Sequence, residues 1–374
     1  MQISSAFDSG AIEVVRADDP RDVHLRLRAD NAADIRQWFH FRVHGAAGRA
    51  LRMVIENAGE ATYADGWPGY RCAASYDRRH WFRVAGTRYE DGALIIDHVP
   101  AHDTIYYAYF EPYSHERHLD LLARVQLSPF ARVRPLGATV DGRALDLVVV
   151  GEPVPGRRPL WIIARQHPGE TMAEWFVEGL LERLLDAADP VARQVRERAV
   201  VYIVPNMNPD GAVRGNLRTN AAGRNLNREW RTPDPLASPE VHLVRAEMER
   251  TGCALFLDIH GDEALPYVFF STAEEVPGFS AATAARQARF SAALCAASPD
   301  FQTEHGYASG RFGEELLTLA SKWVAYRFGC VSLTLEMPFK DNANLPDEAV
   351  GWNGARSARL GAAMLNPILG DLLD

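Results

Sequence analysis

The sequence has few cysteines, and they lie far apart. Its 374 residues include 4 cysteines, at Cys72, Cys253, Cys295 and Cys330, and no two of them form a CxxC pair. Disulfide frameworks and thiolate zinc sites are built from closely spaced cysteines. The spacing therefore argues against both kinds of structure and indicates a reducing compartment.

The sequence also has no long apolar run. A membrane-spanning helix needs about 18 or more consecutive apolar residues, and no such stretch occurs. The start, MQISSAFDSGAIEVVRADDP, has neither the basic residues nor the apolar core of a secretory signal peptide. We therefore expect a cytoplasmic protein that has no membrane partner.

The chain has fewer basic than acidic residues, which gives a net charge of −9 and a pI near 5.8. Without a basic surface field, a nucleic-acid partner is not expected, and a small or peptidic substrate fits better. The chain is 47% hydrophobic and 24% charged, which is ordinary for a globular protein. Its length is typical of two domains.

The first hundred or so residues are typical of β-structure. VHLRLRAD (23–30), WFHFRVHG (38–45) and TIYYAYFEPY (104–113) alternate apolar with polar residues or are rich in aromatic ones. Glycine, aspartate and asparagine separate such segments at intervals of about ten residues, as in antiparallel sandwiches. We predict an all-β antiparallel sandwich over residues 1–125, ending in a short helical connection.

From about residue 135 the pattern becomes α/β. PLWIIARQ (159–166), CALFLDIHG (253–261) and CVSLTLEMP (330–338) contain near-continuous apolar runs, as buried central strands do. Helical patterns separate these runs, for example TMAEWFVEGLLERLLDAA (171–188). Alternating strands and helices predict a doubly wound mixed sheet, and we assign this α/β domain to residues 126–374.

Three of the expected strands end in residues that can bind a metal or move a proton. His167 and Glu170 follow the first strand, and His260 stands at the end of the second. Ligands bind at the carboxyl edge of open α/β sheets, and two histidines with one carboxylate are the ligands of a catalytic zinc site. Taken singly, these histidines also fit a turn residue and a helix-capping residue.

Glu336 lies inside the apolar strand VSLTLEMP. Unpaired glutamate is almost never fully buried, so this position indicates either an ion pair or a functional acid. The segment after the strand AVVYIVPNM is rich in Asn, Gly and Arg, and its arginines include Arg214, Arg218, Arg224 and Arg228. A solvated loop and a site for carboxylates or oxyanions both fit that composition.

Five short motifs follow one another in a fixed order: HPGE (167–170), NPDG (208–211), NLNREW (225–230), DIHGD (258–262) and TLE (334–336). Together they resemble the M14 zinc metallocarboxypeptidases. HPGE and the preceding β-rich region resemble the cytosolic carboxypeptidase, or Nna1-like, branch, which trims glutamates in eukaryotes and has bacterial members. The resemblance implies a zinc-dependent enzyme that removes a C-terminal residue, with glutamate the favoured residue, from peptides or proteins.

The resemblance also assigns roles to individual residues. It implies one Zn²⁺ per chain, held by His167, Glu170 and His260, with Glu336 as the general base. Arg218 in GNLRTN matches the arginine that stabilises the oxyanion. Asn227 and Arg228 match the pair that grips the C-terminal carboxylate of the substrate, and that grip explains selectivity for chain ends.

Asn225 departs from the family pattern, which often has aspartate at this position to support a zinc-bound histidine. A neutral amide raises imidazole basicity less than a carboxylate does, and Asp258 and Asp262 are the candidates to compensate. The tyrosine that closes over the substrate in related enzymes is not identified. Tyr267, Tyr307 and Tyr326 lie in the relevant interval, and each is interpreted as a packing residue.

An acidic C-terminal side chain needs a cationic partner in its pocket. We select Lys322 because it precedes the Glu336 strand, where related enzymes line that pocket. Arg224, Arg311 and Arg327 are the alternatives, and for each of these charges a solvated surface position also fits.

Two other functions fit parts of the pattern. One is a zinc amidohydrolase of the aspartoacylase or succinylglutamate desuccinylase type, which shares the HxxE…H ligands. The other is a catalytically inactive peptide-binding homologue. The NREW segment and the β-domain ahead of the α/β domain favour the peptidase, as does the retention of ligands, base and arginines together.

Overall fold

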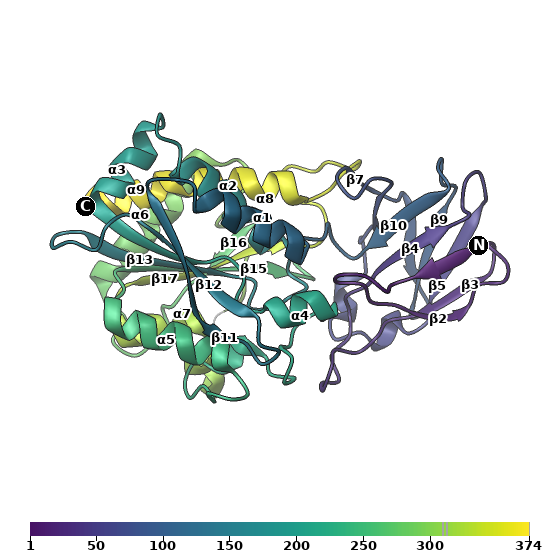
Figure 1. The fold of residues 1–374 in the computed structure, drawn as a ribbon, viewed down its shortest axis with the longest axis horizontal. Coiled ribbons are helices and arrows are strands. Elements are labelled where there is room, and N and C mark those ends of the chain that lie inside the picture. Colours follow the sequence, from purple (N-terminus) through teal and green to yellow (C-terminus); the bar gives the residue numbers. More distant parts are fainter. Residues whose placement is uncertain (309, 312, 374) are drawn as a thin grey trace.

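The N-terminal part of the chain forms two five-stranded sheets packed face to face, shown on the right of Figure 1. A computed structural model describes residues 1–308, 310–311 and 313–373. The first sheet has the order β1-β4-β10-β6-β7 and the second has β2-β3-β5-β9-β8. The strands are β1 (Gln2–Ser4), β2 (Glu13–Arg16), β3 (Val23–Arg26), β4 (His40–His44), β5 (Leu51–Ile55), β6 (Ala73–Ser75), β7 (Trp81–Arg83), β8 (Gly86–Glu90), β9 (Ala93–His98) and β10 (Thr104–Ala108).

Alternating residues of these strands fill the space between the two sheets. Phe41 and Val43 of β4 and Met53 and Ile55 of β5 are fully buried, as the period of two requires. The predicted sandwich is confirmed, with one difference: β3 and β5 pair in parallel. The chain leaves β3, builds β4 in the opposite sheet and then returns, so β5 runs in the same direction as β3.

The second part of the chain has a seven-stranded mixed sheet with the order β11-β12-β14-β13-β15-β17-β16. Neighbours are parallel from β14 to β17, whereas β11, β12 and β16 join as antiparallel strands. This confirms the predicted mixed α/β sheet. The strands are β11 (Ala131–Ala138), β12 (Ala144–Val150), β13 (Arg158–Ala164), β14 (Ala199–Val204), β15 (Leu255–Asp262), β16 (Phe269–Ser271) and β17 (Val331–Pro338).

Helices cover both faces of this sheet (Figure 1). α2 and α8 lie on one face, whereas α5 and α7 lie on the other. The α-helices are α1 (His115–Val125), α2 (Met172–Leu184), α3 (Pro190–Arg198), α4 (Pro209–Arg214), α5 (Pro239–Thr251), α6 (Ala281–Ala297), α7 (Ala320–Phe328), α8 (Gly354–Ala363) and α9 (Leu365–Leu373). Short 3-10 helices are η1 (Ala58–Glu60), η2 (Ala64–Gly66), η3 (Leu226–Arg228) and η4 (Gly313–Thr318). Within the described residues, no helix is long and apolar enough to cross a membrane.

Helix α1 is the short helical connection that the sequence predicts between the two parts. Ser114 caps it by accepting a hydrogen bond from the amide of Arg117. Its buried His118 lies with Nδ1 2.6 Å from Glu174 of α2, so the helix packs on the α/β part. The domain boundary after residue 125 stays a prediction.

The parallel strands bring three of the expected site residues to one edge of the sheet. β13 ends three residues before His167, and His260 lies near the carboxyl end of β15. Glu336 in β17 is the register partner of His260. The carboxyl ends of parallel strands share one edge, so residues far apart in sequence face the same space.

Candidate active site

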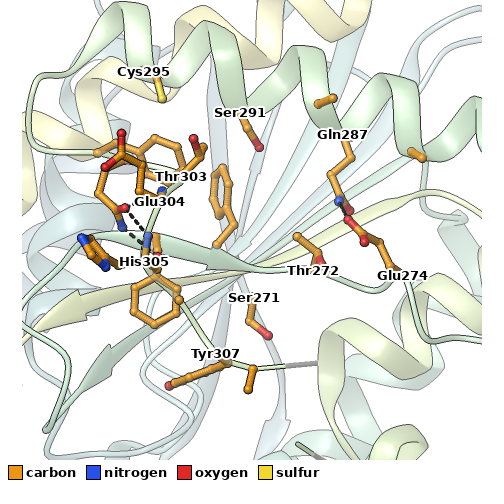
Figure 2. A pocket seen from close by; sticks show the side chains of 18 of the residues that line it. Ser271, Thr272, Glu274, Gln287, Ser291, Cys295, Thr303, Glu304, His305 and Tyr307 are labelled. Carbon is orange, nitrogen blue, oxygen red and sulfur yellow. Dashed lines mark hydrogen bonds between the residues drawn. The ribbon is translucent and has the colours of Figure 1, made fainter. Parts of the chain in front are cut away.

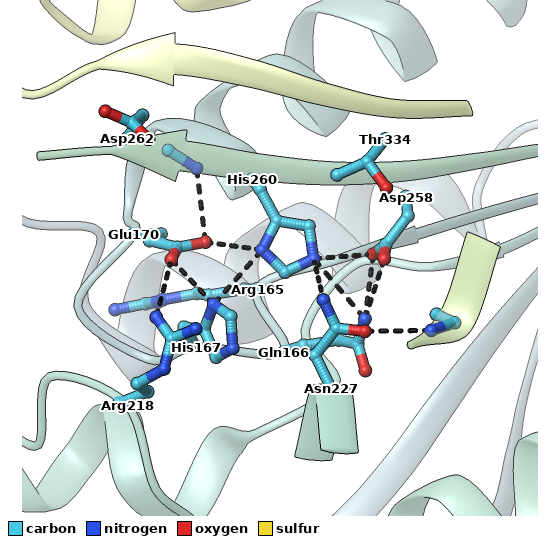
Figure 3. A network of polar contacts seen from close by, with 12 residues as sticks. Arg165, Gln166, His167, Glu170, Arg218, Asn227, Asp258, His260, Asp262 and Thr334 are labelled. Atoms are coloured by element: carbon cyan, nitrogen blue, oxygen red, sulfur yellow. Dashed lines mark hydrogen bonds and ion pairs between the residues drawn. The ribbon is translucent and has the colours of Figure 1, made fainter. Parts of the chain in front are cut away.

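His167, Glu170 and His260 form a buried cluster at this edge (Figure 3). Their candidate ligand atoms all lie within 4.8 Å of one another. Nδ1 of His167 lies 2.6 Å from Oε1 of Glu170, and Nδ1 of His260 lies 2.7 Å from Oε2. The two Nδ1 atoms are 3.1 Å apart. Two nitrogens and one carboxylate converging without a thiolate are a donor set that suits zinc.

The outer nitrogen of each imidazole has its own acceptor. Nε2 of His167 lies 3.1 Å from Oδ1 of Asn225, and Nε2 of His260 lies 2.9 Å from Oδ1 of Asp258. An acceptor there orients each ring and favours the tautomer with its proton on Nε2, so Nδ1 is the nitrogen that faces the cluster. Burial, with help from the charge of Arg218, lowers the pKa of His167 to about 3, which keeps this imidazole neutral. The residues present therefore fit a bound metal ion.

The turn that carries His167 and Glu170 is held from several sides. Arg165, just after β13, has a φ of +58° and is fully buried. Its Nε donates to the Pro168 carbonyl oxygen at 3.0 Å, and its Nη1 donates to Glu174 at 2.6 Å. Gly169 lies against Leu217, where a Cβ would come 3.0 Å from the Leu217 Cα, so a larger residue at this position would have to displace the Leu217 backbone.

Glu336 is 6% exposed and lines the same cavity as the cluster. Burial raises its pKa to about 8, and the nearby carboxylates of Glu170 and Asp262 add to the rise. Among the described residues, its Oε2 has no hydrogen-bond partner. A buried carboxyl oxygen without a partner lies ready to exchange a proton with a bound molecule.

Arg218 reaches the cavity from the loop after α4. Its Nη1 lies 3.9 Å from Oε1 of Glu170, and its guanidinium carbon lies 5.3 Å from the ring centre of Tyr63. Tyr63 comes from the N-terminal sandwich and lines the cavity, as does Asp65. The sandwich therefore forms one wall of this cavity, whose volume is about 280 Å³.

Asn227 and Arg228 line the cavity too, but both already have partners. Oδ1 of Asn227 accepts a hydrogen bond from the amide of Ala320 at 2.8 Å. Nε of Arg228 donates to Oε2 of Glu315 at 3.1 Å, and Glu315 is exposed in η4. A carboxylate thus already occupies one side of the Arg228 guanidinium.

Lys322 lies in a neighbouring cavity of about 1050 Å³ and does not line the smaller one. Its Nζ donates to Oγ of Ser271 at 3.1 Å and to the carbonyl oxygen of Thr272. Burial lowers the pKa of Lys322 to about 8. Figure 2 shows Gln287, Ser291 and Cys295 of α6 on one side of this cavity, opposite Ser271 and Tyr307.

Tyr307 and Arg311 line both cavities and so stand at their junction. Oη of Tyr307 donates to Oδ2 of Asp262 at 2.6 Å, and the guanidinium carbon of Arg311 lies 3.7 Å from the Tyr307 ring centre. Tyr267 instead stacks on His305, and Tyr326 is exposed. Of the three tyrosines considered from the sequence, Tyr307 is therefore the one placed at the cavity.

Several residues of this site were not expected from the sequence. Glu263 is 6% exposed, lines the smaller cavity and, within the described residues, has no partner for its Oε1. Its position directly after DIHGD was the available signal. Tyr63 and Asp65 gave no signal, because nothing in a β-sandwich sequence indicates which loop meets a distant site.

Comparison with known proteins identifies the family. Residues 3–110 match the cytosolic carboxypeptidase N-terminal domain, and residues 117–351 match the zinc carboxypeptidase domain of the M14 family. The chain belongs to the M14 zinc carboxypeptidases. Its two matched regions together place it in the cytosolic carboxypeptidase branch.

Solved structures resemble this carboxypeptidase along its whole length. A metallo-carboxypeptidase from Burkholderia cenocepacia is 56% identical, with a TM-score of 0.97, over 99% of this chain and 98% of that one. A metallo-carboxypeptidase from Pseudomonas aeruginosa, in complex with (2-guanidinoethylmercapto)succinic acid, is 44% identical with a TM-score of 0.95, over 100% of both chains. The protein is accordingly a metallocarboxypeptidase, a peptidase of the hydrolase class.

A mammalian relative is more distant. Mouse cytosolic carboxypeptidase 6 is 28% identical over 339 residues, which are 80% of this chain and 60% of the mouse protein. The family implies zinc as the metal and a peptide or protein as the substrate. These matches favour the peptidase over an aspartoacylase-type amidohydrolase.

Proposed function

We propose that the protein removes single residues from the C-termini of peptides or proteins, with one Zn²⁺ held by His167, Glu170 and His260. The observation that carries this proposal is the convergence of both Nδ1 atoms and both Glu170 oxygens on one point. When bound there, zinc polarises a carbonyl group and makes a water molecule more acidic. The remaining steps belong to the side chains around it.

Glu336 acts as the general base and then as the general acid. Its Oε2 takes a proton from the attacking water molecule and delivers it to the nitrogen of the leaving residue. A pKa raised to about 8 suits both steps, because the group must bind and release a proton near neutral pH. The unpartnered Oε2 supports this assignment.

Arg218 stabilises the negative charge that develops on the substrate carbonyl oxygen. Its position 3.9 Å from Glu170 places a permanent cation beside the candidate metal ligands. A preorganised donor at that point acts mainly on the transition state, where the charge appears.

Asn227 and Arg228 bind the free carboxylate of the substrate. Arg228 offers a forked set of donors, and its pairing with Glu315 supports an affinity for carboxylates. The substrate carboxylate replaces Glu315 on the guanidinium. An internal peptide bond has no such carboxylate, which restricts cleavage to chain ends.

The preferred C-terminal residue is proposed to be glutamate. The two adjoining cavities allow the scissile bond to lie beside the metal cluster while the last side chain extends past Tyr307 and Arg311. Lys322 supports acidic specificity as a cation inside the larger cavity. Arg311, at the junction of the cavities, is the alternative partner for the acidic side chain.

A cytoplasmic location is part of the same proposal. Cys253 and Cys330 are free thiols whose Sγ atoms lie only 3.9 Å apart, which fits a reducing compartment. The name of the mouse relative points in the same direction. Free peptide ends and protein C-termini are the expected substrates there.

A panel of peptides that differ only in the last residue tests the proposal. Each peptide is offered with a free C-terminus and as the C-terminal amide, and mass spectrometry follows its truncation. We expect loss of one residue from the free peptides, fastest for glutamate, and no cleavage of the amides. Faster cleavage of leucine or lysine would reject acidic specificity. An unchanged glutamate preference in Lys322→Ala would reject only that residue and point to Arg311.

A further inference from the structure

One carboxylate of the N-terminal sandwich binds the backbone on both sides of Arg218. Oδ1 of Asp30 accepts from the amide of Leu217 at 2.6 Å, and its Oδ2 accepts from the amides of Arg218 at 2.8 Å and Thr219 at 2.9 Å. The Thr219 hydroxyl also donates to Oδ2, at 3.1 Å. Asp30 itself is 6% exposed. Four donors on one buried carboxylate offset part of its desolvation and fix the register of the loop.

The rest of the contact continues this attachment along the chain. Nδ2 of Asn31 donates to the carbonyl oxygen of Ala221 at 2.7 Å, and Nδ2 of Asn216 donates to Oδ1 of Asn31 at 2.6 Å. Gly223 has a φ of +76°, and a Cβ there would come within 2.5 Å of the Ala32 carbonyl oxygen. Arg28 also donates to the carbonyl oxygen of Arg214, so residues 28–32 of the sandwich lie directly against residues 214–223.

The side chain of Arg218 is held by the same domain. Tyr63 places its ring 5.3 Å from the guanidinium carbon, within range of a cation–π interaction. The loop also connects to the metal cluster, because the amide of Gly169 donates to the Leu217 carbonyl oxygen at 2.8 Å. The peptide group between Leu217 and Arg218 thus links the two. Its N–H donates to the Asp30 carboxylate, and its carbonyl oxygen accepts from the turn between His167 and Glu170.

We propose that Asp30 is a positioning residue for Arg218, so that the N-terminal sandwich sets the rate of the chemical step. The proposal rests on the role of Arg218 given above. Oxyanion stabilisation depends on distance, and a displacement of about 1 Å can cost about 10²-fold in rate. A domain that serves only to hold the fold together would not need to bind three successive amides at this one loop.

Asp30→Asn is the variant that tests the proposal. Asparagine keeps the shape but replaces one acceptor oxygen with an NH₂ group, so either orientation leaves a backbone amide without its acceptor. Asp34→Asn is the matched control, since Asp34 lies in the same segment, is 87% exposed and pairs only with Arg36 among the contacts described. We expect kcat of Asp30→Asn to fall by about 10-fold or more while KM changes less than about twofold. The control variant should match wild type.

A double-mutant cycle distinguishes positioning from general damage. If Asp30 acts through Arg218, Asp30→Asn lowers kcat in the wild-type background and has little further effect on Arg218→Ala. Equal fold losses in both backgrounds would overturn the proposal. Tyr63→Leu keeps the Asp30 hydrogen bonds and removes the ring, so it supplies a second cycle with Arg218→Ala if Asp30→Asn does not fold.

Hydrogen exchange of the amides of residues 217–219, followed by mass spectrometry, gives a measurement that does not depend on activity. We expect faster exchange in Asp30→Asn and unchanged exchange in Asp34→Asn. Unchanged exchange in Asp30→Asn would overturn the positioning role, whatever the activity. Faster exchange with unchanged kcat would overturn its catalytic consequence. Full activity of Arg218→Ala would instead show that the proposed role of Arg218 is wrong.

Discussion

The side-chain oxygen of Asn225 lies 3.1 Å from Nε2 of His167. The equivalent nitrogen of His260 faces the carboxylate of Asp258 at 2.9 Å. The two candidate metal-binding histidines therefore differ in their support, one by a neutral amide and the other by a charged group. A carboxylate makes the imidazole the more basic ligand.

Replacing that amide should tighten metal binding. We expect Asn225→Asp to hold zinc about 10-fold more tightly, because the new carboxylate would support His167 as Asp258 supports His260. Competition with a chelator of known zinc affinity measures the change. Asp258→Asn is the opposite variant and should weaken binding by about 10–100-fold. Equal zinc affinity in wild type and both variants would contradict this account of the histidines.

Glu336→Gln should keep the fold and the metal but lose turnover. The amide is nearly the same size as the carboxyl, yet it cannot accept a proton from water. General acid–base catalysis contributes about 10²–10⁴-fold, and a group that acts twice belongs at the upper end. Steady-state kinetics on a metal-loaded sample tests this. A variant that retained more than about a tenth of wild-type kcat would show that the base lies elsewhere.

Replacement of Arg228 and replacement of Arg218 should change different kinetic constants. Arg228→Ala should raise KM and remove the preference for a free C-terminus, because the substrate carboxylate that Arg228 binds is charged throughout the reaction. Arg218→Ala should mainly lower kcat, because the substrate carbonyl oxygen that Arg218 stabilises becomes charged only in the transition state. Separate kcat and KM values on one peptide check the division. Identical kinetic profiles would rule it out.

Glu315 should compete with the substrate for Arg228. The two side chains are joined at 3.1 Å, and Glu315 is exposed, so the pair is weak and can open. We expect Glu315→Gln to lower KM by about 2–5-fold with little change in kcat, in line with the small free energy of an exposed ion pair. Glu116 of α1 is also exposed and lines neither of the two cavities, so Glu116→Gln serves as the control. An increase in KM would show that Glu315 assists binding.

Glu240 should make stability depend on pH. Burial raises its pKa from 4.5 to about 7, against the hydrogen bonds that it accepts. An acid whose folded-state pKa is raised stabilises the fold fully below its unfolded pKa, and that contribution is lost as pH rises through about 7. The free energy of unfolding should therefore fall between pH 5 and 8, by an amount on the order of 1–3 kcal/mol from this group. Glu240→Gln should flatten this part of the profile, whereas Glu249→Gln, at an exposed position of the same helix, should not.

The alternation of strands and helices in the α/β part could be predicted because buried parallel strands leave long apolar runs, whereas the edge strand β11 was not expected. His167, Glu170, His260 and Glu336 could be located for a related reason: each stands as a polar residue at the end of such a run, or inside it. The three-residue strands β1, β6 and β16 were missed, since so short an element shows no period.

The contacts between the two parts could not be predicted. Asp30 and Arg218 are separated by 188 residues, and no local pattern links them. Tyr63 lies beside a short 3-10 helix. The sequence pattern of its domain indicates only which residues are buried inside that domain. Lys322 was selected for its place ahead of β17. Whether its side chain faces the metal cluster or the neighbouring cavity depends on tertiary packing, which cannot be predicted from the local sequence.

We propose above that removal of a C-terminal residue requires one zinc ion, held by His167, Glu170 and His260. The most direct measurement is a zinc titration of protein stripped with a chelator, during which release of the last residue from a free peptide is followed. We expect no release without zinc and a linear rise in rate that stops at one zinc per chain. Full activity in the stripped protein, or a rise that continues well past one zinc per chain, would contradict it.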